Sequence, residues 1–367
     1  MPNNTSFRPD YAIPPGVTLL ETLDAIGMTQ AELADRMGRP KKTINEIIAG
    51  KAAIIPETAL QLERVLGTPA SFWNNLERNY QEARARIQEE NRLGAEVSWI
   101  NNFPIKKMVK NGWLPKEESA IKQLRTLLNY FGVAGVKEWE SVWDHKHPQA
   151  IYRKSSAFQK NPAAVAAWLR KGEIEARKII CSPYQLSTFK SVLLEIRKLT
   201  VEPPEIFVPE IVRKCASTGV AVIFTPEVPG TRVYGATRWV TSSKALIQLS
   251  LRGKTDDHLW FTFFHEAGHI ILHGKKEVFI EALDGKETST EREAREKKAD
   301  HFAQDFLIPP KEVTVFKGME KITFERINSL ARQLGIAPGI IVGRLQHDGL
   351  VPYSFGNNLK KKFQFNK

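Results

Sequence analysis

Residues 263–273 read FFHEAGHIILH, in which histidines and one glutamate interrupt a run of apolar residues. Apolar residues flank the polar ones at helical spacing, which predicts a buried helix over residues 257–272. His265 and His269 are four positions apart, so both imidazole rings lie on one helix face, about 6 Å apart along the axis. Two such rings can bind one metal ion, and Glu266 beside them can take a proton from water as a general base.

A second helix, expected over residues 290–307, carries the candidate for a third metal ligand. A catalytic zinc ion needs three protein ligands and one open position. Glu296 is the better candidate, and Asp300 lies four residues later on the same face, where it is expected to accept the N–H of a ligand histidine. The alternative is that Glu296 belongs to a solvated charged face, which is the interpretation we prefer for Glu291 and Glu293.

Two further residues are candidates near this site. His273 continues the histidine spacing, but it lies about 12 Å along a straight helix from His265, too far to share one ion. His273 and Tyr234 are instead candidate donors to the oxyanion of a peptide-cleavage reaction. The alternatives are that Tyr234, on a strand expected over residues 232–240, packs in the core, and that His273 caps the end of its helix.

The residues before the histidine motif indicate the fold class. Runs of β-branched and aromatic residues predict three strands, over residues 219–224, 232–240 and 244–251. Earlier residues have helical periodicity, and Pro203, Pro204 and Pro209 mark the change between the two patterns. We therefore predict an α+β multidomain protein. Its predicted parts are an N-terminal all-α helix-turn-helix domain at 1–92, a helical linking region at 93–204, and a compact α+β domain at 205–367.

The first 92 residues have the pattern of a helix-turn-helix. Thr29 and Glu32 form a capping box at the start of one short helix, and Gly38 to Pro40 end it. A second short helix follows, with Ile44 and Ile47 on its inner face. A later helix, expected over residues 71–86, is predicted to turn three apolar residues inward: Phe72, Trp73 and Leu76.

The outer face of this pattern carries polar residues that can contact DNA. Lysine can bind guanine or phosphate, asparagine can pair with adenine, and glutamate can accept from cytosine. The candidate contacts are Gln30, Lys41, Lys42, Thr43, Asn45 and Glu46. The alternative is a solvated helix face in a small bundle.

The net charge does not coincide with this pattern. The 367 residues contain 53 Lys and Arg against 41 Asp and Glu, a formal net charge of +12. Residues 1–100 are net −2, residues 101–200 net +10 and residues 201–367 net +4. The hypothesis of double-stranded DNA binding therefore depends on the helix-turn-helix residues rather than on bulk charge.

Composition also indicates the compartment. Two cysteines cannot form a disulfide framework, which favours a reducing environment. No apolar run is long enough for a membrane span, and the first residues lack signal-peptide features. We expect a cytoplasmic protein that does not bind membranes.

Residues 14–86 resemble the XRE-type helix-turn-helix of HigA-family antitoxins. The resemblance lies in MTQAELA at 28–34, in TINEI at 43–47 followed by Gly50-Lys51, and in Leu66-Gly67-Thr68 followed by Phe72-Trp73. It implies a homodimer on a palindromic operator, with a cognate toxin as a protein partner. This chain has Pro40 where such proteins usually have a serine-like cap before the recognition helix.

Residues 205–345 resemble the ImmA/IrrE family of metallopeptidase-like domains. The resemblance lies in the strands, in the histidine motif, and in ADHFA at 299–303 followed by FLIP at 306–309. It implies a compact gluzincin with Zn²⁺ on His265, His269 and Glu296, and with Glu266 as general base. The family often has Glu-Ala-Asn where this chain has Lys298-Ala299-Asp300, and aspartate is the residue that gluzincins use to support a ligand.

Three interpretations follow. In the first, the chain is a DNA-binding transcriptional regulator that carries a zinc endopeptidase of the HExxH type, whose substrate is a regulatory protein, a toxin or its own segment 87–103. In the second, it is a regulator or antitoxin whose zincin-like domain only senses or binds. The third, a scaffold with a structural zinc, is disfavoured because structural sites close with four Cys or His ligands and no cysteine is near.

Overall fold

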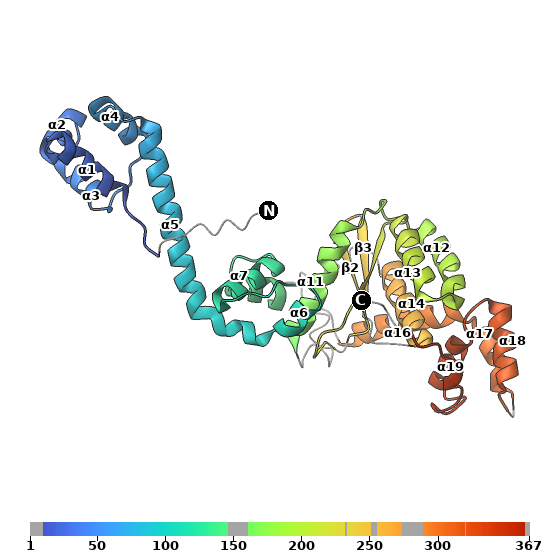
Figure 1. The fold of residues 1–367 in the computed structure, drawn as a ribbon. Helices are drawn as coiled ribbons and strands as arrows, with labels where there is room; N and C mark the ends of the chain where they lie inside the picture. The colour runs from blue at the N-terminus through green and yellow to red at the C-terminus, as the bar shows by residue number, and fades with distance from the viewer. Residues whose placement is uncertain are drawn as a thin grey trace. The chain divides into compact units, whose positions relative to one another are not determined.

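The computed structural model describes residues 10–145, 161–231, 233–250, 255–273, 289–319 and 321–363 (Figure 1). The chain forms two compact units, Met1–Ser98 and Trp99–Lys367. The first is helical and the second combines helices with a three-stranded sheet, so the predicted α+β multidomain class is confirmed. Arg232 and Leu251, the predicted ends of two strands, lie outside the described residues.

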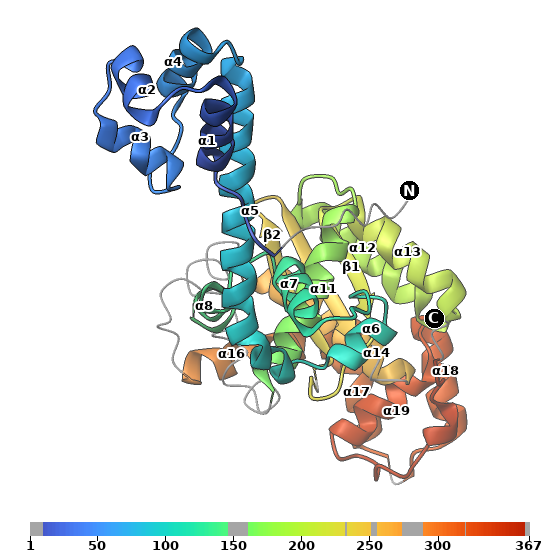
Figure 2. The same cartoon turned by 60° about the vertical axis from the view of Figure 1, so that its left-hand side comes forward.

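The first unit is a bundle of four short helices and one long one (Figure 2). Their bounds are α1 Pro15–Ile26, α2 Gln30–Met37, α3 Lys41–Ile48, α4 Pro56–Leu66 and α5 Ala70–Glu96. The hydroxyl oxygen of Thr29 accepts a hydrogen bond from the backbone N–H of Glu32 (3.1 Å), and α2 ends at Gly38 in the left-handed conformation. Leu19, Leu33 and Ile44 form part of the buried core.

Helix α5 differs from its predicted form in two respects. It continues to Glu96 rather than to residue 86, because the added turns consist mainly of strong helix formers. Phe72 was expected inside, yet its exposed fraction is 43%, whereas Trp73 is fully buried. The two residues point about 100° apart around the helix, so only one of them can face the core.

The second unit begins with helices that enclose an aromatic core. Trp139 lies between Trp99, Phe103 and Phe131, with ring centroids 5.3–5.6 Å apart. The helices before the sheet are η1 Val97–Asn102, α6 Ile105–Lys110, α7 Ala120–Phe131, α8 Val136–Trp139, η2 Glu140–His145, α11 Pro162–Lys178, α12 Leu186–Lys198, η3 Leu199–Val201 and α13 Pro204–Ala216.

Helix α13 runs through the predicted proline boundary. Pro204 starts the helix, where a missing N–H has no cost, and Pro209 lies inside it. The change from helical to strand periodicity occurs after Ala216 instead. Residues 99–204, which are most of the linking region predicted at 93–204, lie in the same compact unit as the sheet.

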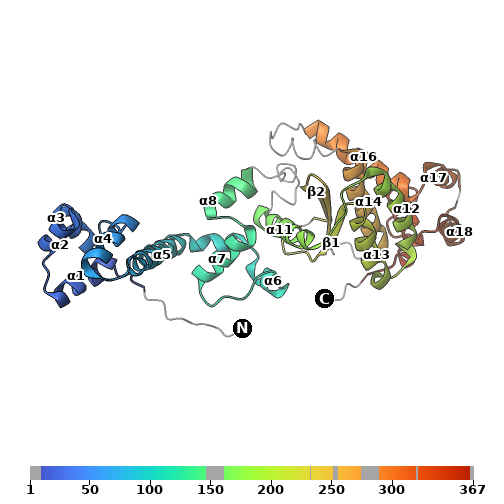
Figure 3. The ribbon, with the colours of Figure 1, turned by 90° about the horizontal axis from the view of Figure 1, so that it is seen from above.

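The sheet has the order β1-β3-β2. Its strands are β1 Val220–Thr225, β2 Gly235–Thr241 and β3 Lys244–Ser250. β1 is parallel to β3, with Val220 opposite Ala245, and β2 is antiparallel to β3, with Gly235 opposite Leu249. Helix α11 covers one face, and α13 and α14 (Asp256–Leu272) cover the other (Figure 3). Among the described residues β2 pairs only with β3, so it is an edge strand.

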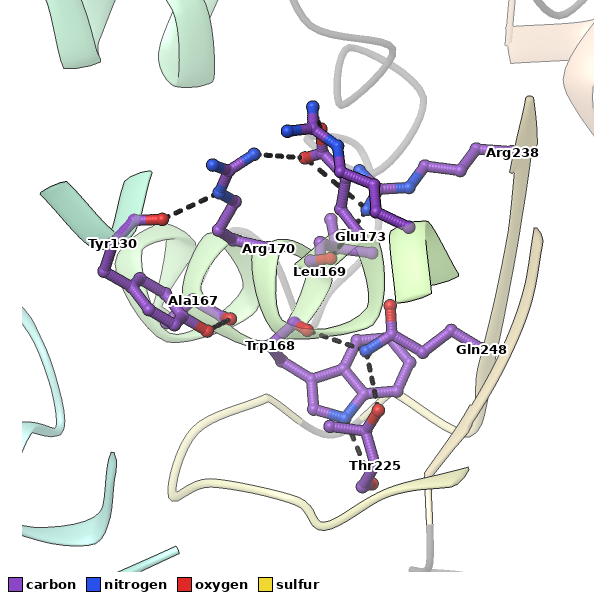
Figure 4. Close-up of polar contacts among 10 residues, drawn as sticks. Tyr130, Ala167, Trp168, Leu169, Arg170, Glu173, Thr225, Arg238 and Gln248 are labelled. Atoms are coloured by element: carbon purple, nitrogen blue, oxygen red, sulfur yellow. Dashed lines mark hydrogen bonds and ion pairs between the residues drawn. The ribbon is translucent and has the colours of Figure 1, made fainter. Parts of the chain in front are cut away.

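A buried polar network holds α11 against the sheet (Figure 4). The side-chain amide of Gln248 on β3 donates to Trp168 O (2.7 Å) and to Thr225 Oγ1 (3.1 Å). Arg238 on β2 donates to Leu169 O (2.8 Å). Gly172 makes this approach possible, because a Cβ there would lie 1.9 Å from the amide oxygen of Gln248.

The same network includes charges at its edge. Arg170 and Glu173 on α11 form an ion pair (2.9 Å), and Arg238 lies 3.8 Å from Glu173. Burial alone would raise the pKa of Glu173, but Arg238 and Arg170 hold it below its usual value. β2 is therefore fixed on one face by α11 and on the other by α14.

The remaining helices follow α14, and the end of the described chain contacts the first residues of α14. They are α16 Ser289–Leu307, α17 Pro310–Lys317, α18 Phe324–Leu334, α19 Pro338–His347 and η4 Asn357–Leu359. Lys360 pairs with Asp257 (2.6 Å) and Lys361 O accepts from the N–H of Asp256 (2.9 Å). None of the helices in the described part of the chain combines the length and the apolar character that a bilayer crossing requires.

Candidate metal centre

Helix α14, which packs against β2 and β3, carries the histidine motif. Phe263 and Phe264 anchor the helix in the hydrophobic core, and both are fully buried. The exposed fractions of the His265 and His269 side chains are 15% and 19%, so both rings remain accessible. The hydroxyl of Thr237 on β2 donates to the backbone carbonyl of Glu266 (3.0 Å), which fixes this turn against the edge strand.

Helix α16 approaches α14 closely at Gly268. A Cβ at this position would lie 3.4 Å from Ala299 Cα and 3.0 Å from a ring atom of Phe302. The small residues therefore let the two helices pack side by side, and this contact brings Glu296 of α16 to the histidines.

The three candidate ligands converge. His265 Nε2 and His269 Nε2 are 3.1 Å apart, and Glu296 Oε2 is 3.3 Å from the first and 3.7 Å from the second. A tetrahedral zinc ion with bonds of about 2.0–2.1 Å separates its ligand atoms by about 3.3 Å. Two imidazole nitrogens and one carboxylate oxygen are also a donor set that zinc prefers, so these residues fit the ion.

Asp300, the residue predicted to support a ligand histidine, lies beside His265. Its carboxylate accepts a hydrogen bond from Nδ1 of His265 (2.8 Å), and this bond directs Nε2 of the same ring toward Glu296. The carboxylates of Asp300 and Glu296 stabilise the protonated form of His265. Burial alone would lower the pKa of His265, but hydrogen bonds to Asp300 and Glu296 raise it to about 10.

Glu296 is affected in the opposite direction. Burial alone would raise its pKa, but hydrogen bonds with His265 and His269 hold the pKa well below its usual value. Glu296 is therefore ionised at neutral pH and carries the negative charge that a cation would need. The predicted solvated-face alternative does not describe Glu296, because the carboxylate is directed at the two rings.

Helix α3 of the first unit presents the candidate DNA contacts. Lys41, Lys42 and Asn45 are exposed, and Lys42 lies 3.8 Å from Glu46. Thr43 and Glu46 on this helix, and Gln30 at the start of α2, are partly exposed.

Pro40 provides no side-chain cap for α3, and Arg39 fastens this turn in another way. Its guanidinium donates to Gln61 Oε1 (2.5 Å) and pairs with Glu57 (3.2 Å), both on α4. The sequence pattern did not indicate Arg39, because its partners lie about twenty residues away.

Two family descriptions match separate parts of the chain. Residues 19–73 match the helix-turn-helix family, and residues 215–346 match the IrrE N-terminal-like domain of the peptidase M78 family. An uncharacterized helix-turn-helix transcriptional regulator of Escherichia coli K12, YddM, is 34% identical over 71 residues, which are 19% of this chain and 76% of that protein. The chain belongs to the helix-turn-helix regulators. It also carries an IrrE-like domain, as the two sequence resemblances predicted.

Other relatives match the helix-turn-helix part. Virulence-associated protein A of Dichelobacter nodosus is 33% identical over 72 residues, covering 19% of this chain and 71% of the relative. A solved antidote protein of the HigA family from Coxiella burnetii is 30% identical, with a TM-score of 0.22, and the match covers 23% of this chain and 94% of that one. The helix-turn-helix match lies within the first unit and the IrrE-like match within the second.

The two oxyanion candidates of the IrrE-like domain lie in different places relative to the candidate metal ligands. Tyr234 lies just before β2 with an exposed fraction of 48%, and its ring stacks against His258, about two helical turns before His265. The alternative that Tyr234 packs in the core is therefore wrong. His273 is buried at the C-terminal end of α14, with its ring centroid 5.4 Å from that of His269.

One residue beside the general-base candidate of the IrrE-like domain was not predicted. Glu266 is 7% exposed, and Gly235 of β2 lies against its carboxylate. A Cβ at Gly235 would be 2.6 Å from Glu266 Oε1 and 2.7 Å from Thr262 Cγ2. A glycine inside a strand often marks a close approach of another group to the backbone, and this is the one signal in the sequence that could have pointed to Gly235.

Proposed function

We propose that this helix-turn-helix regulator acts as a zinc-dependent endopeptidase, a cytoplasmic hydrolase that cleaves a regulatory protein. The observation that carries the proposal is the convergence of His265, His269 and Glu296 within zinc-ligand distance of one another, with Glu266 next in the chain. Asp300 supports it, because an exposed charged face has no need of a carboxylate that fixes one histidine tautomer.

Each residue then has a role. His265, His269 and Glu296 would hold the zinc ion, which when bound supplies Lewis-acid chemistry toward the carbonyl of the scissile peptide. The carboxylate of Glu266 would take a proton from the attacking water and pass it to the leaving amine. Asp300 would keep the proton on Nδ1 of His265, so that Nε2 remains a ligand.

The edge of the sheet gives an extended substrate a place to bind. Ser250 N–H donates to Tyr234 O (2.8 Å), and bonded residues alternate along an antiparallel pair, so Gly235 and Thr237 direct their backbone groups away from β3. An extended peptide can pair with such an edge through its own backbone. Because Gly235 touches Glu266, a peptide paired there would pass the general base.

The proposed partners follow from the two units. The first unit would bind a double-stranded operator as a homodimer, since two recognition helices double the number of contacts. The substrate of the second unit would be a protein, either another regulator or a cognate toxin. The candidate DNA contacts remain those on α2 and α3: Gln30, Lys41, Lys42, Thr43, Asn45 and Glu46.

Zinc content tests the ligand set directly. The wild-type chain is expected to bind one zinc ion per chain, and Glu296→Gln is expected to lower the zinc affinity at least about tenfold, because it removes the only anionic ligand. Glu293→Gln is the matched control, because it removes an exposed carboxylate from the same helix. Elemental analysis after dialysis against a weak chelator measures both. Equal zinc content in the two variants would remove Glu296 from the site.

The pKa of His265 predicts how zinc binding depends on pH. In the metal-free protein His265 holds a proton up to a pKa of about 10, so zinc must displace that proton at neutral pH. The apparent zinc affinity is therefore expected to rise about tenfold per pH unit between about pH 7 and pH 9. Competition with a chelator of known pH dependence measures this slope. An affinity independent of pH over this range would contradict the role of His265 as a ligand that loses a proton when zinc binds.

A further inference from the structure

Helix α6 has a face made of lysines. Met108 is fully buried in the aromatic core of the second unit, and Ile105 and Val109 pack against the same core. The opposite side carries Lys106, Lys107 and Lys110, of which the first and last are exposed. Residues 97–116 contain four lysines and no acidic residue. A firmly anchored helix therefore presents concentrated positive charge.

These lysines differ from the basic residues of α11 and from Lys214 of α13. In the part of the chain that the structure describes, none of the three makes an ion pair. On α11, by contrast, Lys171 and Lys178 both pair with Glu175 (2.6 and 3.0 Å), and farther along Lys214 on α13 pairs with Glu195. The positive charge of these three lysines is thus neutralised locally, whereas the charge of α6 is not.

We propose that the lysine face of α6, defined by Lys106, Lys107 and Lys110, binds the phosphate backbone of double-stranded DNA beside the operator. The unit that reads DNA supplies little phosphate attraction itself, because residues 1–100 are net −2 and Lys42 on its recognition helix lies near Glu46. Helix α6 begins nine residues after α5 ends, so it follows the reading unit directly in the chain. A membrane surface fits less well, because the apolar side of α6 is already buried in the protein.

Salt dependence of binding tests this proposal. Each phosphate contact contributes about 0.9 to the slope of log affinity against log salt concentration. The triple variant Lys106→Gln, Lys107→Gln, Lys110→Gln is expected to reduce the slope by about 2 to 3 per bound protomer, and to weaken binding at low salt by about tenfold or more. Fluorescence anisotropy with a mixed-sequence duplex of about 60 base pairs, titrated in KCl from about 50 to 300 mM, measures both quantities.

The matched control removes the same charge from paired lysines. Lys171→Gln, Lys178→Gln, Lys214→Gln is expected to leave the slope close to that of the wild type. A slope unchanged in the α6 variant, or reduced equally in both variants, overturns the proposal. So does a result in which the α6 variant keeps its duplex affinity but loses binding to poly-glutamate, because the partner would then be an acidic protein.

A further variant separates this surface from sequence readout. Lys42→Ala with Asn45→Ala is expected to abolish sequence-specific retention of genomic fragments while leaving the salt slope on mixed-sequence DNA within about 1 of the wild type. The α6 variant is expected to select the same fragments as the wild type, with lower affinity. Loss of fragment selection in the α6 variant would mean that α6 reads sequence, which contradicts a backbone contact.

Discussion

Replacing Glu266 with Gln is expected to abolish peptide cleavage by the zinc-loaded chain while leaving its zinc content and its DNA binding unchanged. Glutamine has the size and shape of glutamate, so the buried turn beside Thr237 remains intact, but its neutral amide cannot accept a proton from water. The loss of a general base typically lowers a rate by about 10²- to 10⁴-fold. Digestion of a proteome-derived peptide library, analysed by mass spectrometry, measures the cleavage of many sequences at once.

A control variant and the wild-type chain are compared with Glu266→Gln in this experiment. Glu293→Gln, on the exposed side of α16, is expected to cleave at the wild-type rate and controls for the loss of one carboxylate. Cleavage that persists in Glu266→Gln would exclude the proposed mechanism. A wild-type chain that binds zinc fully yet cleaves no peptide and no intact protein would favour the alternative function, a regulator whose second unit senses or binds without turnover.

The elements around the metal centre could largely be predicted from sequence. The helix predicted over 257–272 is α14, Asp256–Leu272, and the helix predicted over 290–307 is α16, Ser289–Leu307. The signals of α14 are clear, because it has a buried apolar pattern and a motif whose chemistry requires one helical face. The sequence predicts that Asp300 accepts the N–H of a ligand histidine, because residues four apart on a helix face the same neighbour, but it does not say which histidine; in the structure the partner is His265.

Features that depend on contacts between distant residues could not be predicted in this way. The lysines at 360–362 resemble a solvated tail in sequence, yet Lys360 is nearly buried against Asp257, about one hundred residues earlier. Pro209 looks like a helix boundary but lies within α13. Tyr234 precedes β2 and stacks against His258, because the strand begins at Gly235 rather than at residue 232. In each case contacts with residues distant in the sequence decide the structure, and the local sequence pattern does not reveal those contacts.

Gly235→Ala is expected to lower peptide cleavage by about 10²-fold without unfolding the protein or removing zinc. The new Cβ would lie 2.6 Å from Glu266 Oε1 and 2.8 Å from Glu266 Cγ, so the glutamate side chain must move away. Gly235 does not have a positive φ, so alanine fits the strand backbone. A displacement of about 1 Å in a reacting group can cost about 10²-fold in rate. Cleavage of the best library peptide, measured with zinc content and thermal melting, separates these effects.

Gly318→Ala provides the control for this substitution. Gly318 ends α17, has no heavy atom within 4 Å of its added Cβ and no positive φ, so the same chemical change meets no obstacle. Its cleavage rate is expected to equal that of the wild type. If Gly235→Ala cleaves normally, Glu266 can work from a displaced position, and β2 does not set its geometry. If Gly235→Ala also loses zinc, the strand supports the ligands on α14 as well as the general base, and the edge of β2 is part of the metal centre itself.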